Sequence, residues 1–287
     1  MSKLIQWPVA KYWDKAWNPV IGCRKCSPAC KNCYAEAMME RFGYLDEDGF
    51  PSFRPCETKQ KRPPRSGVVF VGNMTDLFGE WLDEEPWTPP NKPIPSPVST
   101  FISATLDGMR RCFAGASGPT YLWLTKRVQR MCKALHECRV EVGRAWWNLD
   151  DFMRTPRSMG CFDNQYWGFT AENQEWYDRR KWDWRGGAPS WAKGWLSAEP
   201  LLGPIDPGLR YIAPEDQPFK WVVVGCESGP HRRPCKVEWV ERIVDECLSI
   251  GVPVFVKQLD LDGSCERDIS KFPKHLRIRQ VPWAEKE

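Results

Sequence analysis

Short apolar runs alternate with polar segments along this chain, and six of these runs share one character. Each is three to five residues long, is rich in Val, Trp, Tyr and Phe, and ends at polar or small residues. Runs of this kind predict strands that are buried on both faces, as in a parallel sheet. The predicted strands are residues 68–72, 121–124, 166–169, 194–196, 221–225 and 252–256.

Helical patterns follow two of these strands. Residues 237–250 place their apolar side chains at helical spacing, and Gly251 supplies a C-terminal stop. Residues 128–142 predict a second helix. Repeated units of strand, loop and helix predict the α/β class with mainly parallel strands.

Polar side chains follow all six predicted strands. In parallel α/β proteins the ligand site lies at the carboxyl ends of the strands, where the loops converge. A polar residue at one strand end is equally well explained as the point where the strand leaves the core, but six polar ends favour a shared site. The candidates are Asn73, Thr75, Asp76, Lys126, Arg127, Thr170, Glu172, Asn173, Ser197, Glu199, Cys226, Glu227 and Lys257.

Composition and charge narrow the class of protein. The 287 residues contain 41 Lys and Arg against 37 Asp and Glu, a balance of +4 that neither indicates nor excludes a nucleic-acid partner. Because no apolar run reaches the length of a membrane span and the N-terminus lacks a signal peptide, we expect a cytoplasmic protein. The 17 Trp and 26 Pro favour a compact fold over disorder.

The chain is interpreted as one domain over residues 1–287. Residues 84–97 are rich in Pro and predict a stiff connection rather than a domain linker. Residues 59–65 form a basic loop, which is either a phosphate contact or a solvated surface segment. From about residue 260 we expect an irregular C-terminal extension.

Four cysteines within eleven residues are the sharpest chemical signal. Cys23, Cys26, Cys30 and Cys33 predict a metal site, whereas most of the other cysteines are expected to be reduced thiols. A three-thiolate set, ending in Cys30 and Cys33 and beginning at either Cys23 or Cys26, would leave one iron of a [4Fe-4S] cluster open. Structural zinc on all four is the alternative, although paired zinc knuckles are normally farther apart. A pure electron carrier would not need some 250 further residues.

Residues 17–23 (Trp-Asn-Pro-Val-Ile-Gly-Cys) and 27–36 (Ser-Pro-Ala-Cys-Lys-Asn-Cys-Tyr-Ala-Glu) resemble the signature of a phage-encoded three-cysteine family that is grouped with radical S-adenosylmethionine enzymes. The resemblance extends from about residue 17 to residue 258. Its further blocks are residues 70–78, 124–127, 168–174, 196–205, 224–230 and 253–258.

This resemblance implies a partial (β/α)6 TIM-like barrel with a [4Fe-4S] cluster on the loop after the first strand. S-adenosylmethionine would bind the open iron and be cleaved to methionine and a 5′-deoxyadenosyl radical, which abstracts hydrogen from the substrate. The family pattern points to Cys23 as the first ligand, whereas the common superfamily spacing selects Cys26. Asn32 stands where the superfamily usually has an aromatic residue.

The resemblance also suggests roles for the strand ends. Gly72 would allow close backbone approach, and Asn73, Thr75 and Asp76 would hold the cofactor's amino group, unless they cap a helix. Lys126 would bind the cofactor carboxylate or a substrate phosphate, or lie as a charge on a helix surface.

The remaining candidates would hold the cofactor ribose or the substrate. Three carboxylates meeting at one site would repel each other unless cations pair with them, which favours pairing with Lys126 or Lys257. Cys226, Glu227 and Lys257 are the catalytic candidates, with Cys226 either a hydrogen donor to a substrate radical or a buried structural thiol. The candidates for ribose or substrate binding are Thr170, Glu172, Asn173, Ser197 and Glu199.

The implied partners are a nucleotide or DNA base as substrate, an electron donor such as flavodoxin or ferredoxin, and a family partner protein. If the protein is phage-encoded, as the resemblance implies, its location would be the host cytoplasm. The competing hypothesis is a non-catalytic module, stabilised by zinc or an iron–sulfur cluster, that binds nucleic acid or protein.

Overall fold

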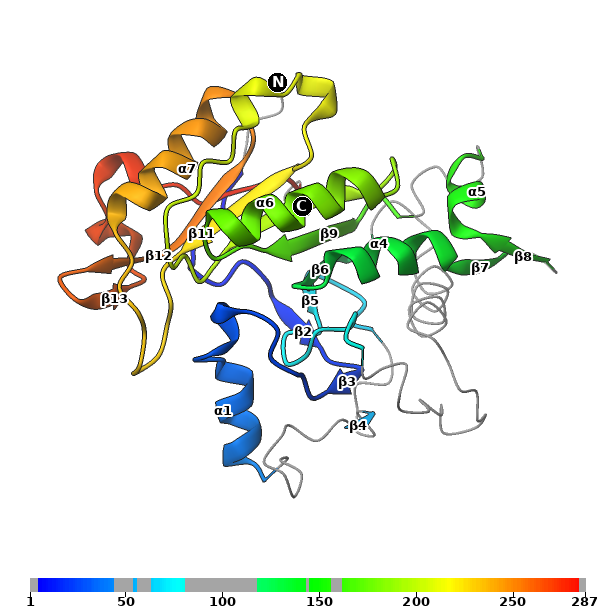
Figure 1. Ribbon diagram of the computed structural model, residues 1–287, viewed down its shortest axis with the longest axis horizontal. Coiled ribbons are helices and arrows are strands. Elements are labelled where there is room, and N and C mark those ends of the chain that lie inside the picture. Colours follow the sequence, from blue (N-terminus) through cyan, green and yellow to red (C-terminus); the bar gives the residue numbers. More distant parts are fainter. Residues whose placement is uncertain are drawn as a thin grey trace.

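The computed structural model describes residues 5–43, 54–55, 63–80, 118–142, 145–155 and 162–283. Its centre is an eight-stranded sheet with the order β13-β12-β11-β10-β9-β6-β5-β2 (Figure 1). All six predicted strands are present in it. The eight strands of the sheet are β2 (Lys15–Trp17), β5 (Val68–Val71), β6 (Thr120–Thr125), β9 (Gln165–Thr170), β10 (Lys193–Ala198), β11 (Trp221–Gly225), β12 (Val254–Leu261) and β13 (Ser264–Glu266).

Every neighbouring pair from β2 to β12 is parallel, and only β13 runs antiparallel, against β12. The predicted α/β class with mainly parallel strands is therefore confirmed. The strands follow one another in chain order, and because β2 to β12 are parallel, the carboxyl ends of these seven strands lie along one edge. Because β2 and β13 end the sheet without pairing to each other, the described strands do not form a closed barrel.

Both faces of the sheet are buried, as the unbroken apolar runs predicted. Alternate residues of each strand, such as Val69 and Trp123, belong to a core that includes α4 (Val128–Glu137), α6 (Gln174–Gly187) and α7 (Val237–Ser249). These helices lie along one side of the sheet (Figure 1).

The opposite face of the sheet carries a second, mainly aromatic cluster. Tyr12 lies in it with its ring centroid 5.1 Å from that of Trp221 and 5.5 Å from that of Phe255. Trp195 of β10 also belongs to this cluster and lies against Gly168 of the neighbouring strand β9. A Cβ atom at position 168 would lie 2.4 Å from the Trp195 indole. Several tryptophans are thus core residues, and glycine in mid-strand gives one of them room.

One helix prediction is wrong in its C-terminal part. The helix expected over residues 128–142 ends at Glu137, and Arg139–Val142 forms β7, which pairs antiparallel with β8 (Ala145–Asn148). The segment Arg-Val-Glu-Val alternates polar and apolar residues, which is the period of a strand, and Val140 is fully buried. The helix predicted over 237–250 is confirmed as α7.

Short elements complete the fold. β1 (Ile5–Gln6) pairs with β14 (Gln280–Val281), and β3 (Val20–Ile21) pairs with β4 (Arg54–Pro55). Among the described residues, the other helices are α1 (Tyr34–Arg41) and α5 (Leu149–Met153), and the 3-10 turns are Pro28–Cys30, Leu209–Tyr211, Pro214–Asp216, Ile269–Lys271 and Lys274–Leu276.

Two predicted connections cannot be compared with the structure. The proline-rich residues 84–97 lie outside the described residues, as do 59–62 of the basic loop. Within the described part of the chain, no helix has both the length and the apolar character needed to cross a bilayer.

Candidate functional site

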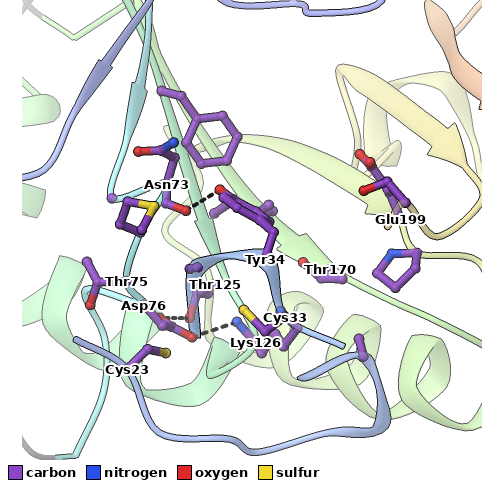
Figure 2. A pocket seen from close by; sticks show the side chains of 18 of the residues that line it. Cys23, Cys33, Tyr34, Asn73, Thr75, Asp76, Thr125, Lys126, Thr170 and Glu199 are labelled. Atoms are coloured by element: carbon purple, nitrogen blue, oxygen red, sulfur yellow. Dashed lines mark hydrogen bonds between the residues drawn. The ribbon is translucent and has the colours of Figure 1, made fainter. Parts of the chain in front are cut away.

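A cavity opens at the carboxyl ends of the parallel strands, as the polar strand ends predicted (Figure 2). The loops after β5, β6, β10 and β11 contribute to its wall, together with Thr170 at the end of β9, Lys257 within β12, the cysteine loop and the N-terminal segment. The predicted site residues that line it are Cys23, Cys33, Gly72, Asn73, Thr75, Asp76, Lys126, Thr170, Glu199, Cys226, Glu227 and Lys257. Those outside its lining are Cys26, Cys30, Arg127, Glu172, Asn173 and Ser197.

The four clustered cysteines divide into two environments. The hydrogen bond between the Cys26 and Cys30 thiols lowers the pKa of Cys30 to about 4, against the effect of burial. The same hydrogen bond, together with burial, raises the pKa of Cys26. Burial and the neighbouring Asp76 carboxylate raise the pKa of Cys23 to about 12. In the described part of the chain, no three His, Cys, Asp or Glu side chains are already gathered around a point where a metal ion would fit. The thiols would have to draw together to bind one.

Lys126 is a cation of the cavity wall that lies near the cysteine loop. Burial disfavours its charge, but the sulfurs of Cys30, Cys33 and Cys23, together with the Asp76 carboxylate, raise its pKa above the ordinary value. Figure 2 shows Cys23, Cys33 and Lys126 at the same end of the cavity. Three of the four thiols therefore lie within electrostatic reach of one ammonium group at the cavity wall.

Asp76 joins the end of β5 to the end of β6. Its Oδ1 accepts hydrogen bonds from the Thr125 hydroxyl (2.7 Å) and the Phe78 amide (3.1 Å). Its Oδ2 accepts from the Lys126 amide (2.9 Å) and the Arg127 guanidinium (3.1 Å). Both oxygens are thus engaged by the protein itself, which favours a structural role over the predicted contact with a cofactor ammonium.

Asn73 and Thr75 attach the loop after β5 to the cysteine loop. The Asn18 amide donates to Asn73 Oδ1 at 2.6 Å, and the Tyr34 hydroxyl donates to the Asn73 carbonyl. The Thr75 hydroxyl donates to the Gly22 carbonyl. These bonds bring the first cysteine of the cluster to the cavity.

Three residues predicted to bind a ligand instead contribute to the fold itself. Gly72 has φ +71°, a conformation that favours glycine and turns the chain at the end of β5. Asn173 caps α6, because its side chain accepts a hydrogen bond from the Trp176 amide at 3.1 Å. Ser197 is buried within β10.

Glu172 is fully buried and pairs with Arg180 of α6. The Arg180 Nη1 donates to Glu172 Oε2 at 2.6 Å, and the Ala29 amide of the cysteine loop lies 3.4 Å from the other carboxylate oxygen. Arg180 is also buried and donates to the Thr170 carbonyl at 2.8 Å. This pair lies behind the cavity wall and supports the cysteine loop.

Glu199 and Lys257 form an ion pair inside the cavity, with 2.5 Å between Oε1 and Nζ. The expected pairing of a carboxylate with Lys257 is therefore confirmed for Glu199, whereas Glu172 uses Arg180. The Lys257 ammonium also lies 5.7 Å from the ring centroid of Tyr12 and 5.5 Å from that of Trp13.

Part of the cavity wall is aromatic and was not predicted from the sequence; it consists of Tyr12, Trp13 and Phe70. Tyr12 and Trp13 lie between β1 and β2, shortly before β2 begins at Lys15, and nothing in their local pattern marks them as ligand contacts. Their aromatic density was the available signal, but it is equally typical of a core.

Glu227 faces the cavity but is bound by Arg233, and Asn32 of the cysteine loop donates to it at 3.0 Å. The neighbouring Cys226 thiol is buried and donates to the Cys265 sulfur at 3.8 Å. This hydrogen bond, against the effect of burial, lowers the pKa of Cys265 to about 7.

Neither a curated protein nor a solved structure matches the chain. A family model described as "Protein of unknown function (DUF5131)" matches residues 9–89 and 98–276. The matched ranges include the cysteine loop and all seven parallel strands. Because the match covers most of the chain, this protein belongs to the DUF5131 family.

Proposed function

We propose that this protein is a radical S-adenosylmethionine enzyme whose Cys23, Cys30 and Cys33 hold a [4Fe-4S] cluster. The observation that carries the proposal is the shared position of these thiols. Cys23 and Cys33 line the cavity, and both lie with Cys30 within electrostatic reach of Lys126. Cys23 lines the cavity whereas Cys26 does not, which favours Cys23 over Cys26 as the first ligand.

The donor set suits an iron–sulfur cluster better than zinc. Soft thiolates are the ligands that such clusters require, and three of them leave one iron open toward the cavity. Such a cluster supplies the electron that cleaves S-adenosylmethionine to methionine and a 5′-deoxyadenosyl radical. The Lys126 ammonium would balance part of the negative charge of the thiolates.

The strand order supports a partial barrel as the scaffold. Seven parallel strands follow one another in chain order, and the aromatic cluster fills the face opposite the helices. We propose that the sheet curves around this cluster as the open barrel that the family resemblance implied. The cysteine loop, which follows β2, would then lie at the barrel mouth.

The cavity wall favours a substrate with a planar ring. The half-buried Trp13 offers an aromatic face, and the Glu199–Lys257 pair offers both a hydrogen-bond acceptor and donors beside it. Stacking of a base on such a face contributes roughly 1–3 kcal/mol. These features support a nucleotide or a DNA base removed from its duplex. Cys226, at the same wall, remains the candidate hydrogen donor to a substrate radical.

The enzyme would depend on an electron donor such as flavodoxin or ferredoxin. The ten cysteines in the described part of the chain are all free thiols, which is typical of a reducing compartment and supports a cytoplasmic location.

Anaerobic reconstitution with iron and sulfide tests the proposal. We expect about four irons per chain, loss of the cluster's absorbance in Cys23→Ala, Cys30→Ala and Cys33→Ala, and its retention in Cys26→Ala. The buried Cys132 is a control, and its replacement by Ala should leave the iron content unchanged.

The second arm of the test follows cofactor cleavage. With dithionite, the reconstituted protein should release 5′-deoxyadenosine from S-adenosylmethionine, detected by chromatography. Stoichiometric zinc without iron uptake would overturn the proposal and favour a zinc-stabilised binding module. An iron-replete protein that cleaves no S-adenosylmethionine would overturn the enzymatic part.

A further inference from the structure

The loop after β11 lies against the cysteine loop, although the two are far apart in the chain. The Asn32 amide donates to Glu227 Oε2 at 3.0 Å across 195 residues of sequence. The Arg233 Nη1 donates to the Pro28 carbonyl at 2.9 Å across 205 residues. The Asn32 amide also donates to the His231 carbonyl at 2.6 Å. Three polar contacts thus join the two loops.

Glu227 and Arg233 are themselves locked together. Glu227 Oε2 accepts hydrogen bonds from the Arg233 backbone amide (2.8 Å) and from its Nε (2.9 Å), and Oε1 accepts from Nη2. The Glu227 side chain is 4% exposed and that of Arg233 is 28% exposed. A forked guanidinium that binds both oxygens of a nearly buried carboxylate is a strong and directional pair.

The contacts of this pair bracket two of the cysteines. Pro28 begins the 3-10 turn that contains Cys30, and Asn32 directly precedes Cys33. Arg233 therefore holds the chain before Cys30, and Glu227 holds it before Cys33. Both oxygens of Glu227 are occupied by these partners, so its position at the cavity wall does not make it available to a substrate.

We propose that Glu227 and Arg233 are positioning residues that hold the segment of the cysteine loop carrying Cys30 and Cys33 in place beside the cavity. This assigns Glu227 a role different from the catalytic one expected from the sequence. The chemical meaning of the inference rests on the proposed function, since it is the cluster that needs the cysteines placed. The contacts themselves belong to the protein without metal and can be tested in that state.

Arg232 provides a matched control in the same loop. Its guanidinium pairs with Asp260 at 2.9 Å and donates to the Gly263 carbonyl, on the side of β13. Arg232→Ala removes the same charge from the adjacent position, but none of its contacts in the described residues reaches the cysteine loop. If Arg233 acted only through the stability of the β11 loop, the two substitutions would have similar effects.

The first experiment measures hydrogen–deuterium exchange of the metal-free protein by mass spectrometry. In Arg233→Ala we expect amide exchange in the peptide covering residues 24–33 to become at least about tenfold faster, because the Pro28 anchor and the partner of Glu227 are lost. Glu227→Gln should give a smaller increase, since it retains an acceptor but loses the charge. Arg232→Ala should exchange like the wild type over this peptide.

The second experiment measures the cluster in the reconstituted full-length protein. Iron release to a chelator should be about tenfold faster in Arg233→Ala than in the wild type. Arg233→Lys keeps the charge without the fork and should restore part of the retention. The electron paramagnetic resonance spectrum of the reduced cluster should change in Arg233→Ala and remain as in the wild type in Arg232→Ala.

The outcomes separate this inference from the proposed function. Wild-type exchange over residues 24–33 in Arg233→Ala and Glu227→Gln would overturn the positioning role, and so would an equal effect of Arg232→Ala. If the wild type binds no iron, the proposed function fails, while the exchange data still decide whether the pair orders the cysteine loop. If Arg233→Ala does not fold, the comparison of Arg233→Lys with Arg232→Ala carries the same decision.

Discussion

The buried Glu172–Arg180 pair predicts a large loss of stability on removal of one charge. Glu172 is fully buried, the side chain of Arg180 is 2% exposed, and their atoms approach to 2.6 Å. Glu172→Gln keeps the size and one acceptor but leaves the guanidinium without its counter-charge in a site that water does not reach. Breaking a buried pair in this way costs roughly 3–5 kcal/mol. Because Gln retains an acceptor, we expect about 3 kcal/mol, near the lower end of that range.

Glu246 offers a matched comparison for this substitution. It is also a buried carboxylate, but its partner Arg210 is 49% exposed and lies 3.4 Å away. In Glu246→Gln the arginine remains solvated by water, so we expect a loss of only about 1 kcal/mol. The difference between the two variants isolates the cost of an unpaired cation in the interior.

Urea unfolding of the metal-free protein, followed by tryptophan fluorescence, measures the free energy of unfolding of both variants, and thermal unfolding measures their melting temperatures. For a chain of this size a loss of about 3 kcal/mol should lower the melting temperature by roughly 6 °C. The double variant Glu172→Gln with Arg180→Gln should lose less than the sum of the two single losses, by about 1–3 kcal/mol. A Glu172→Gln protein within about 0.5 kcal/mol of the wild type would refute the reasoning and return Glu172 to the list of ligand candidates.

Three further predictions concern the thiol pair, a helix cap and a crowded glycine. The rate of Cys265 alkylation should rise with pH through a midpoint of about 7, because its thiolate forms there, and Cys226→Ala should move that midpoint up toward the ordinary value of about 8.5; an unchanged midpoint would exclude the Cys226 hydrogen bond as the cause. Asn173→Ala should cost about 1 kcal/mol in thermal unfolding through loss of the α6 cap, whereas Asn173→Asp should cost little. Gly194→Ala should cost about 1–3 kcal/mol, since its Cβ atom would lie 2.2 Å from a backbone carbonyl oxygen, and wild-type stability would contradict that packing.

The strands and one helix were predictable because their signals are local. An apolar run such as residues 221–225 is buried on both faces in any parallel sheet, so composition alone identifies it. The stripe of α7 likewise repeats with the period of a helix. The boundary at Glu137 was missed because the alternation in Arg139–Val142 spans only four residues, and the pairing of this segment with β8 is a tertiary contact. β2 has three residues, which is too few for any pattern to appear.

By itself the sequence determined the class of fold, the cysteine cluster and the polar strand ends, because composition and spacing along the chain are sufficient for each. Which cation meets which carboxylate was decided only by the tertiary structure. Glu172 pairs with an arginine from a helix, and Glu227 holds a loop that lies 195 residues earlier in the chain. Such pairs form where distant segments meet, and their energy depends on burial and on distances of a few ångströms. Neither burial nor these distances can be read from the order of the residues, so the sequence did not indicate that Glu172 and Glu227 contact the cysteine loop.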